Sequence, residues 1–273
     1  MHTNKNQFLH SWAIILGGSS GFGFATVEKL AMHGMNIAVL YRETATAERS
    51  IKEKFLKLSK TFEINIEPFN INALDTLARQ TFIEQLTTII KKKHRVRLLL
   101  HTIARGNLKP LVLPGVDPAK SNEVLSVEDI QLTTYAMSIS LLDWARSILK
   151  AELFQPDARI IGLTSEGAHK FWGSYAAVSI AKASLESLAT YMAIELSKYG
   201  LKTNLIQAGI TETPSLKKIP ESEKLIRIAK DRNPLGRITK PMDVANVVYL
   251  LCTDEASWIN GSLIHVDGGE HCR

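Results

Sequence analysis

The segment Leu16–Gly23, LGGSSGFG, follows a short apolar run over Ala13–Leu16 and opens a stretch with helical spacing that ends near His33. A glycine-rich turn between a strand and a helix lets the backbone approach a pyrophosphate, and the free N–H groups of the helix N-terminus favour its negative charge. A glycine turn alone could be structural, but its place between a strand and a helix indicates nucleotide binding. The predicted cofactor-binding residues of this turn are Gly17, Ser19, Ser20, Gly21, Phe22 and Gly23.

Apolar runs and helical stretches alternate along the rest of the chain. Strands are predicted over 13–16, 36–40, 63–69, 97–100, 159–163, 203–206 and 262–266, and helices over 21–33, 43–61, 75–93 and 129–153. This alternation is typical of an α/β protein with a doubly wound parallel sheet, a Rossmann fold, in a single domain over residues 1–273. Residues 1–11 are interpreted as a polar tail, and Asn107–Glu128 is a long irregular stretch with no assigned role.

Composition excludes several classes of protein. The chain has 273 residues, of which 45% are hydrophobic, enough for one large core. No apolar run approaches the ~20 residues that cross a bilayer, so no membrane span is expected. The net charge of +6 invites a nucleic-acid interpretation, but the basic residues are scattered without interleaved aromatic residues, so no nucleic-acid partner is expected. The densest basic run, Lys91–Arg95, is interpreted as the C-terminus of a helix.

The two cysteines, Cys252 and Cys272, form neither a metal-binding spacing nor a disulfide framework. No metal site is therefore predicted. Two unpaired thiols suit a reducing compartment, and a cytoplasmic location is expected.

The end of the second predicted strand bears on the choice of dinucleotide. An NAD site usually has a carboxylate there to bind the ribose 2′-hydroxyl, but this strand ends in Tyr41 and Arg42. A planar guanidinium suits a 2′-phosphate by charge and by geometry. Arg42 therefore predicts NADP(H), whereas a solvated Arg42 with Glu43 as the acid would predict NAD.

A tyrosine and a lysine seven residues apart carry the catalytic prediction. Tyr175 precedes Lys182 in the segment that begins at Ser165, and residues seven apart lie on one face of a helix. From Gly17 to Gly269 the chain resembles the short-chain dehydrogenase/reductase superfamily, most of which carries Tyr-x3-Lys; Val178 holds that tyrosine position here. The Tyr-x6-Lys spacing, and the KASLE that starts at Lys182, resemble the enoyl-acyl-carrier-protein reductases of type II fatty acid synthesis.

This resemblance implies an NADPH-dependent reduction of the 2,3 double bond of an enoyl thioester. Tyr175 would donate a hydrogen bond to the thioester oxygen, and Lys182 would bind the nicotinamide ribose hydroxyls. The alternative is that Tyr175 packs at the start of a helix. Ser165 stands where ketone-reducing relatives carry a serine that holds the substrate oxygen, and a divergent subgroup of enoyl reductases has serine here too. Ser165 would therefore assist Tyr175 or only cap the preceding strand.

The resemblance also assigns residues around the cofactor. The segment Leu98–Ala104 stands where most of the superfamily has Asn-Ala-Gly, and its His101-Thr102-Ile103 again resembles enoyl reductases. His101 is interpreted as a hydrogen-bonded, partly buried imidazole and not as a proton donor. Met137 or Ser138 stands at the catalytic-helix asparagine, which counts against simple ketone reduction. The implied cofactor-binding residues are Asn70 and Ile71 near the adenine, Thr102, Ile103 and Ala104 beside the cofactor, and Gly209, Thr211 and Thr213 in the loop that contacts the nicotinamide amide and the phosphates.

Pro214–Asn233 is where this family places a mobile substrate lid. It mixes apolar residues with Lys217, Lys218, Lys224, Arg227, Lys230 and Arg232. An apolar lining would suit an acyl chain and a basic rim an acidic acyl carrier protein, whereas a solvated amphipathic helix is the alternative. By family analogy the chain is expected to form a homotetramer.

Three functions remain open from the sequence: an enoyl-thioester reductase, an NADP-dependent 3-ketoacyl or carbonyl reductase that uses Ser165, and a non-catalytic nucleotide-binding subunit.

Overall fold

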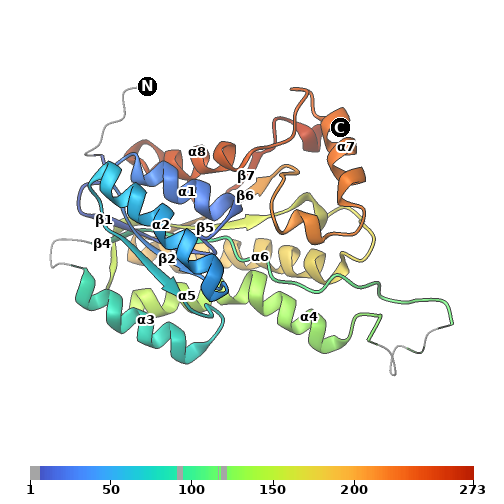
Figure 1. Cartoon of the computed structure of the whole chain (residues 1–273), viewed down its shortest axis with the longest axis horizontal. Helices are drawn as coiled ribbons and strands as arrows, with labels where there is room; N and C mark the ends of the chain where they lie inside the picture. Colours follow the sequence, from blue (N-terminus) through green and yellow to red (C-terminus); the bar gives the residue numbers. More distant parts are fainter. Residues whose placement is uncertain (1–6, 91–94, 116, 118–121) are drawn as a thin grey trace.

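The computed structural model describes residues 7–90, 95–115, 117 and 122–273, and these form a seven-stranded parallel sheet between two layers of helices (Figure 1). The strands lie in the order β3-β2-β1-β4-β5-β6-β7, and the predicted doubly wound Rossmann fold is confirmed. The strands are β1 (Ser11–Leu16), β2 (Asn36–Tyr41), β3 (Ile66–Asn70), β4 (Arg95–His101), β5 (Phe154–Thr164), β6 (Lys202–Ala208) and β7 (Leu263–Val266).

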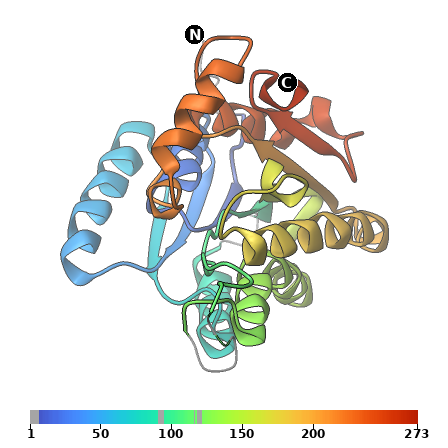
Figure 2. The ribbon, with the colours of Figure 1, turned by 90° about the vertical axis from the view of Figure 1, so that its right-hand side faces the viewer.

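The two faces of the sheet are buried by different helices. The main helices are α1 (Gly21–Ala31), α2 (Ala45–Phe62), α3 (Thr76–Ile89), α4 (Val127–Thr134), α5 (Ser140–Lys150), α6 (Ala176–Glu195), α7 (Ser222–Arg232) and α8 (Pro241–Cys252). Residues alternate across the strands, so Ile14 of β1 lies in one core with α3, α5 and α6, and Ile15 lies in another with α1, α2 and α8. Figure 2 shows helices on both sides of the sheet. Burial on both faces explains why these strands are continuous apolar runs.

The sheet places the carboxyl ends of its strands at one edge. The glycine turn follows β1, Arg42 follows β2, Thr102 follows β4, Ser165 follows β5 and Gly209 follows β6. Ligands of open α/β sheets bind outside this edge, near the point where the strand order reverses, which here lies between β1 and β4.

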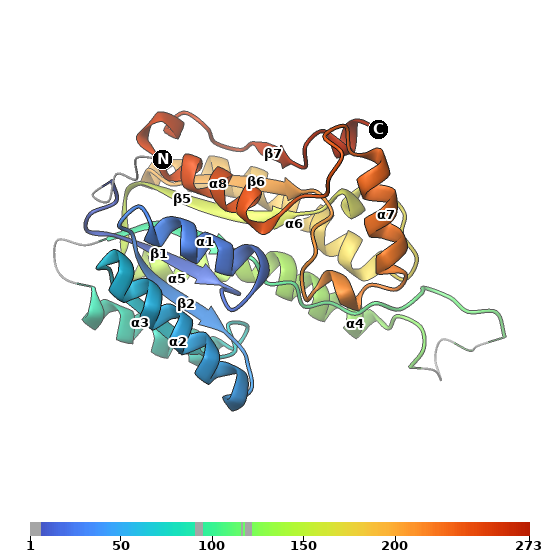
Figure 3. The same ribbon diagram turned by 45° about the horizontal axis from the view of Figure 1, so that its top comes forward.

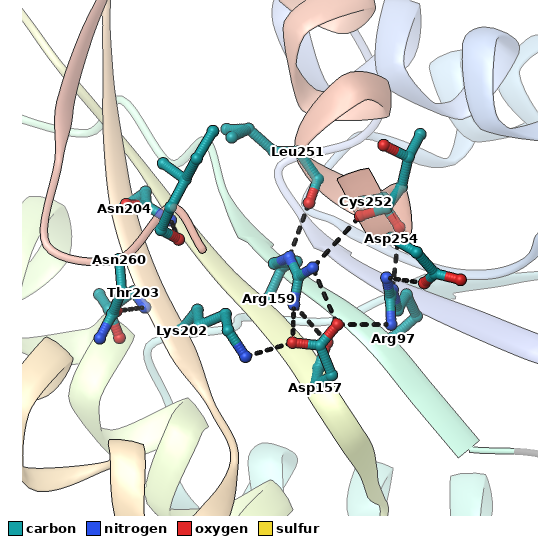
Figure 4. A network of polar contacts seen from close by, with 12 residues as sticks. Arg97, Asp157, Arg159, Lys202, Thr203, Asn204, Leu251, Cys252, Asp254 and Asn260 are labelled. Carbon is teal, nitrogen blue, oxygen red and sulfur yellow. Dashed lines mark hydrogen bonds and ion pairs between the residues drawn. The ribbon is translucent and has the colours of Figure 1, made fainter. Parts of the chain in front are cut away.

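A polar network lies at the other end of the strands, among β4, β5, β6 and the end of α8 (Figure 4). The Arg159 side chain is fully buried; its guanidinium donates to the Leu251 carbonyl and lies 2.7 Å from an Asp157 carboxylate oxygen. Arg97 and Lys202 pair with the same carboxylate. Buried guanidinium groups require such partners, so this network stabilises the fold away from the nucleotide edge.

The predicted helix over 129–153 is interrupted. A π-helical segment, Tyr135–Ile139, separates α4 from α5. The Ser140 hydroxyl donates to the Ala136 carbonyl (3.1 Å) and lies 2.8 Å from Nε2 of His101. Side-chain insertion into the helical ladder is a recognised cause of such irregularity.

Several boundaries also differ from the prediction. The third strand begins at Ile66 and not at Glu63, because Glu63 ends α2 in the left-handed conformation (φ 57°). The predicted helix over 75–93 ends at Ile89 as α3; the basic run from Lys91 to His94 lies outside the described residues.

The tail prediction for residues 1–11 is wrong for its second half. Phe8 is buried against α8, its ring lies 5.9 Å from that of Tyr249, and its N–H donates to the His33 carbonyl. Burial of this aromatic side chain anchors the segment, and β1 begins at Ser11. Residues 1–6 lie outside the described residues.

The described residues of the irregular stretch, 107–115, 117 and 122–128, extend beyond the body of the molecule beside α4 (Figure 3). Its base is held where the Asn107 amide and the Lys109 ammonium both bind the Asp129 carboxylate. Pro118 of this stretch lies outside the described residues. Among the helices that the structure describes, none has the length and apolarity to cross a membrane.

Candidate active site

Two positions of the glycine turn, Gly17 and Gly23, have no room for a side chain. A Cβ on Gly23 would lie 2.3 Å from the Gly17 carbonyl oxygen, and a Cβ on Gly17 would lie 2.8 Å from the Thr102 hydroxyl. Gly17 also has φ 92°, which an L side chain rarely adopts. The Ser20 side chain does not cap α1, so N–H groups of its first turn remain directed at this edge. The turn is shaped for close approach of an anion.

A cavity of about 310 Å³ lies between this turn and the ends of β2 and β4. It brings together residues that were predicted separately: Gly17, Ser19, Ser20, Arg42, Ile71, Thr102, Ile103 and Ala104. Asn70 is not among its lining residues, because the Asn70 amide binds the backbone of Glu43 and the carboxylate of Glu48. We call this space the nucleotide cavity.

Three cations and a carboxylate line the nucleotide cavity. The cations are Arg42, Arg105 and Lys218, and the carboxylate is that of Glu43. The Glu43 carboxylate accepts a hydrogen bond from the Ser19 hydroxyl (2.9 Å), which ties it to the glycine turn. Lys218 comes from the segment predicted as a lid, and sequence reasoning had assigned it only to a carrier-protein surface.

A second cavity, about 190 Å³, continues from the nucleotide cavity toward α6, and we call it the reaction cavity. Thr102, Ile103 and Ala104 line both cavities. The other predicted residues that line the reaction cavity are Phe22, Ser165, Tyr175, Lys182, Gly209, Thr211 and Thr213. Gly21 lies beside it, since a Cβ there would lie 3.3 Å from the Thr213 methyl group.

Tyr175 is the residue immediately before α6, with φ −102° and ψ 3°. Its ring lies against Gly167, where a Cβ would come within 2.5 Å of the ring. Burial raises the pKa of Tyr175, and a hydrogen bond with Ser165 opposes this. The hydroxyl is therefore protonated at neutral pH and can act as a hydrogen-bond donor.

Lys182 lies two turns into α6 and is 8% exposed. Its ammonium donates to the Leu163 carbonyl at 2.7 Å, which fixes it at the carboxyl end of β5. Burial lowers the pKa of Lys182 to about 8, and the charge of Glu186 opposes this shift. At neutral pH the ammonium is mostly protonated.

The position of Ser165 is compatible with both roles considered from the sequence, which are capping the end of β5 and assisting Tyr175. Its hydroxyl accepts from the Gly167 N–H at 3.2 Å and so caps the turn after β5. It also lines the reaction cavity beside Tyr175.

A third cavity of about 240 Å³ adjoins the reaction cavity and shares Ser165, Tyr175 and Ile210 with it. We call it the lid cavity, because Ile219 and α7 form one wall. Its apolar lining comes from Phe171, Trp172, Ile210, Ile219, Leu225, Ile228 and Ala229.

Arg232 joins the lid to the body in a way that sequence reasoning missed. Its guanidinium lies 2.5 Å from Glu166 and 2.7 Å from Glu270. Arg232 therefore does not belong to the exposed basic rim in which it was placed. Glu270 is 2% exposed and also accepts from the Ile210 N–H at 3.2 Å, so these ion pairs connect three segments of the lid cavity. The partners are 66 and 38 residues apart, and no local pattern indicates them.

His101 is hydrogen-bonded, as predicted, but fully buried. Its Nε2 lies 2.8 Å from the Ser140 hydroxyl, and burial together with the charge of Lys182 lowers the pKa of His101 to about 3. The imidazole is therefore neutral and structural. In the described part of the chain, no group of three or more His, Cys, Asp or Glu side chains could hold a metal ion.

Comparison with known proteins gives a consistent picture of the whole chain. Residues 17–271 match the family described as Enoyl-(Acyl carrier protein) reductase. A probable 2,4-dienoyl-CoA reductase of Bacillus subtilis is 30% identical, with 94% of this chain and 95% of that protein covered. A tropinone reductase homolog of Arabidopsis thaliana is 28% identical, with coverage of 94% and 92%. The enoyl-[acyl-carrier-protein] reductase (NADH) of Aquifex aeolicus has the same fold, with a TM-score of 0.81 at 22% identity and 98% of each chain covered.

Proposed function

We propose that this chain, an oxidoreductase that belongs to the enoyl-(acyl carrier protein) reductase-type family of short-chain dehydrogenases/reductases, reduces the 2,3 double bond of enoyl thioesters with NADPH. The observation that carries the proposal is the meeting of Tyr175 and Lys182 in the reaction cavity, directly beyond the nucleotide cavity.

The residues present fit a nicotinamide dinucleotide. Gly17 and Gly23 allow the close backbone packing that forms the turn, and a side chain at either position would displace the turn or Thr102. A turn of this kind after the first strand suits a pyrophosphate. Arg42 and Lys218 would bind a 2′-phosphate, and Lys182 would bind the nicotinamide ribose hydroxyls. Thr211 and Thr213 would contact the nicotinamide amide and the phosphates. Glu43 already accepts from Ser19, which supports NADPH over NADH.

The cofactor, when bound, supplies a hydride to the β-carbon of the enoyl thioester. Negative charge then develops on the thioester oxygen, and the buried Tyr175 hydroxyl donates a hydrogen bond to that oxygen. The low dielectric that raises the pKa of Tyr175 also strengthens this interaction. The enolate then takes a proton from solvent at its α-carbon, which gives the saturated product. The lid cavity would hold the acyl chain between Ile219, Leu225 and Ile228.

A second candidate is reduction of a 3-ketoacyl or other carbonyl group. The hydrogen bond between Ser165 and Tyr175 supports it, because both hydroxyls could hold one carbonyl oxygen. The name of the tropinone reductase homolog agrees with that chemistry. The Tyr-x6-Lys spacing supports the enoyl assignment instead.

One assay separates these candidates. NADPH absorbance is followed with a crotonyl thioester and, separately, with an acetoacetyl thioester. Oxidation with the crotonyl substrate alone is expected, whereas oxidation with the acetoacetyl substrate alone would establish ketoreduction. Binding of NADPH without turnover of either would indicate a nucleotide-binding subunit. Tyr175→Phe should abolish turnover and spare NADPH binding; the matched control is Tyr191→Phe, at an exposed position of α6.

An acidic acyl carrier protein as the substrate donor is the finer part of the proposal. Lys217, Arg227 and Lys230 lie exposed on the lid, whereas Lys218 also lines the nucleotide cavity. Reversing the charge of Lys217 and Arg227 should therefore raise KM for a carrier-bound substrate more than for an enoyl-CoA, without the cofactor effect that Lys218 would add. Equal effects on both substrates would reject carrier docking. The role in fatty acid biosynthesis, the homotetramer and the cytoplasmic location stay predictions.

A further inference from the structure

One carboxylate on α6 holds both ends of the turn that carries Ser165. The Thr164 hydroxyl, just before the turn Ser165–Ala168, donates to Oε1 of Glu186 at 2.6 Å. Nε2 of His169, just after the turn, lies 2.7 Å from Oε2 of the same residue. The Glu186 side chain is only 17% exposed, whereas that of His169 is 60% exposed. The Thr164 contact is therefore the better shielded of the two and restricts the turn more strongly.

Glu186 lies one helical turn beyond Lys182, on the same face of α6. The Lys182 ammonium binds the carbonyl of Leu163, and Glu186 binds the side chain of the next residue, Thr164. Two successive turns of α6 therefore bind the last two residues of β5. This arrangement links the position of the Lys182 ammonium to the position of Ser165.

The charge of Glu186 matters because Lys182 is buried. Burial of an ammonium favours loss of its proton, and Glu186 is the charge that opposes this loss. The other titratable groups around the ammonium are Tyr175, whose hydroxyl is neutral, and His101 on β4, whose ring is neutral. The exposed His169 contacts the far oxygen of the carboxylate.

We propose that Glu186 is a positioning residue of this active site: its carboxylate fixes both ends of the Ser165–Ala168 turn and lies one helical turn from Lys182 as its counter-charge. The inference rests on the proposed contact between Lys182 and the cofactor ribose. Hydrogen bonds from an ammonium are stronger than those from a neutral amine, so loss of the proton weakens the hold on the ribose hydroxyls.

Substitutions separate the two parts of this role. Glu186→Gln keeps an acceptor for the Thr164 hydroxyl but removes the charge. Thr164→Val removes one of the two contacts and keeps the charge. Glu195→Gln is the matched control, because Glu195 is exposed in the last position of the same helix.

The readout is the dissociation constant of NADPH, measured by fluorescence without substrate as the pH is raised. Wild-type binding is expected to weaken as the pH passes the Lys182 pKa of about 8. In Glu186→Gln the midpoint should fall by about 1 pH unit, since an adjacent opposite charge shifts a pKa by that order. Thr164→Val and Glu195→Gln should keep the wild-type midpoint. Thr164→Val should lower kcat about fivefold, the effect of one hydrogen bond, where Glu195→Gln has none.

Glu186→Asp tests the role of the charge in a variant that keeps a carboxylate at position 186. It should restore the wild-type midpoint, while kcat stays lowered because the shorter carboxylate cannot reach both ends of the turn. A Glu186→Gln midpoint equal to that of Glu195→Gln would overturn the inference, as would an equal shift in Thr164→Val. A wild-type profile without a step would overturn the role of Lys182 and this inference together. A normal step with no enoyl reduction would refute only the proposed function.

Discussion

The buried imidazole of His101 makes the stability of this fold depend on pH in a defined way, and His101→Gln tests it. The ring is 1% exposed and contacts the Ser140 hydroxyl beside the π-helical segment. It joins the end of β4, just before the cofactor-lining residues that begin at Thr102, to the start of α5.

The magnitude follows from the two protonation states. Burial, and secondly the charge of Lys182, lower the pKa of His101 to about 3 in the folded chain, whereas an unfolded histidine titrates near ~6.5. The imidazole bound in the fold is neutral, so its contribution is complete above the unfolded pKa and is lost as the pH falls toward the folded pKa. Between pH ~7 and pH ~5 only the unfolded chain takes up the proton, which lowers the free energy of unfolding by about 2 kcal/mol.

Urea unfolding of the wild type and His101→Gln at pH values from ~7 to ~5 measures this term. The variant should be less stable at pH ~7 by about 1–3 kcal/mol, because a buried hydrogen bond is disturbed. Between pH ~7 and pH ~5 the free energy of unfolding should fall less in the variant than in the wild type, by about 2 kcal/mol. Burial also lowers the pKa of His33, but both proteins keep His33, so its contribution cancels in the comparison. Equal pH slopes in the two proteins would refute a neutral buried His101.

Three further substitutions probe other parts of the molecule. Asp157→Asn leaves the fully buried Arg159 without its counter-ion. Urea unfolding should show a free energy of unfolding lower by about 3 kcal/mol, and the NADPH affinity should be unchanged. A loss of stability too small to measure would contradict a stabilising role of the network in Figure 4. Gly23→Ala places a Cβ against the Gly17 carbonyl and should weaken NADPH binding by about 100-fold in a fluorescence titration, so wild-type affinity would exclude the turn as the pyrophosphate site. Arg232→Gln breaks the ion pairs that join α7 to the rest of the protein. In steady-state kinetics it should raise KM about tenfold, with kcat less affected. An unchanged KM would show that the lid does not contribute to substrate binding.

Features set by local pattern could be predicted from the sequence. The strand, glycine turn and helix around Gly17 are contiguous, and the apolar strands β1, β2 and β4 are buried on both faces of the sheet. The spacing of Tyr175 and Lys182 was sufficient to indicate that both would reach one place, and both line the reaction cavity.

Features set by contacts between distant residues could not be predicted. The π-helical segment ends at Ser140, whose hydroxyl contacts His101, a residue 39 positions away. The helix that carries Lys182 begins only after Tyr175, a boundary that the periodicity does not mark. In the sequence, nothing distinguishes Glu186 from the other charged residues of a helix. Only the structure shows that Thr164 and His169 both bind its carboxylate.

The central claim is that hydride reaches the β-carbon of an enoyl thioester while Tyr175 binds the thioester oxygen. NADPH carrying deuterium at the transferred position of the nicotinamide ring, incubated with a crotonyl thioester, tests this most directly when the product is analysed by nuclear magnetic resonance. The account predicts a saturated product with deuterium at the β-carbon, and no such product from Tyr175→Phe. An unreacted crotonyl thioester, with deuterium appearing instead at the former carbonyl carbon of an acetoacetyl thioester, would contradict it.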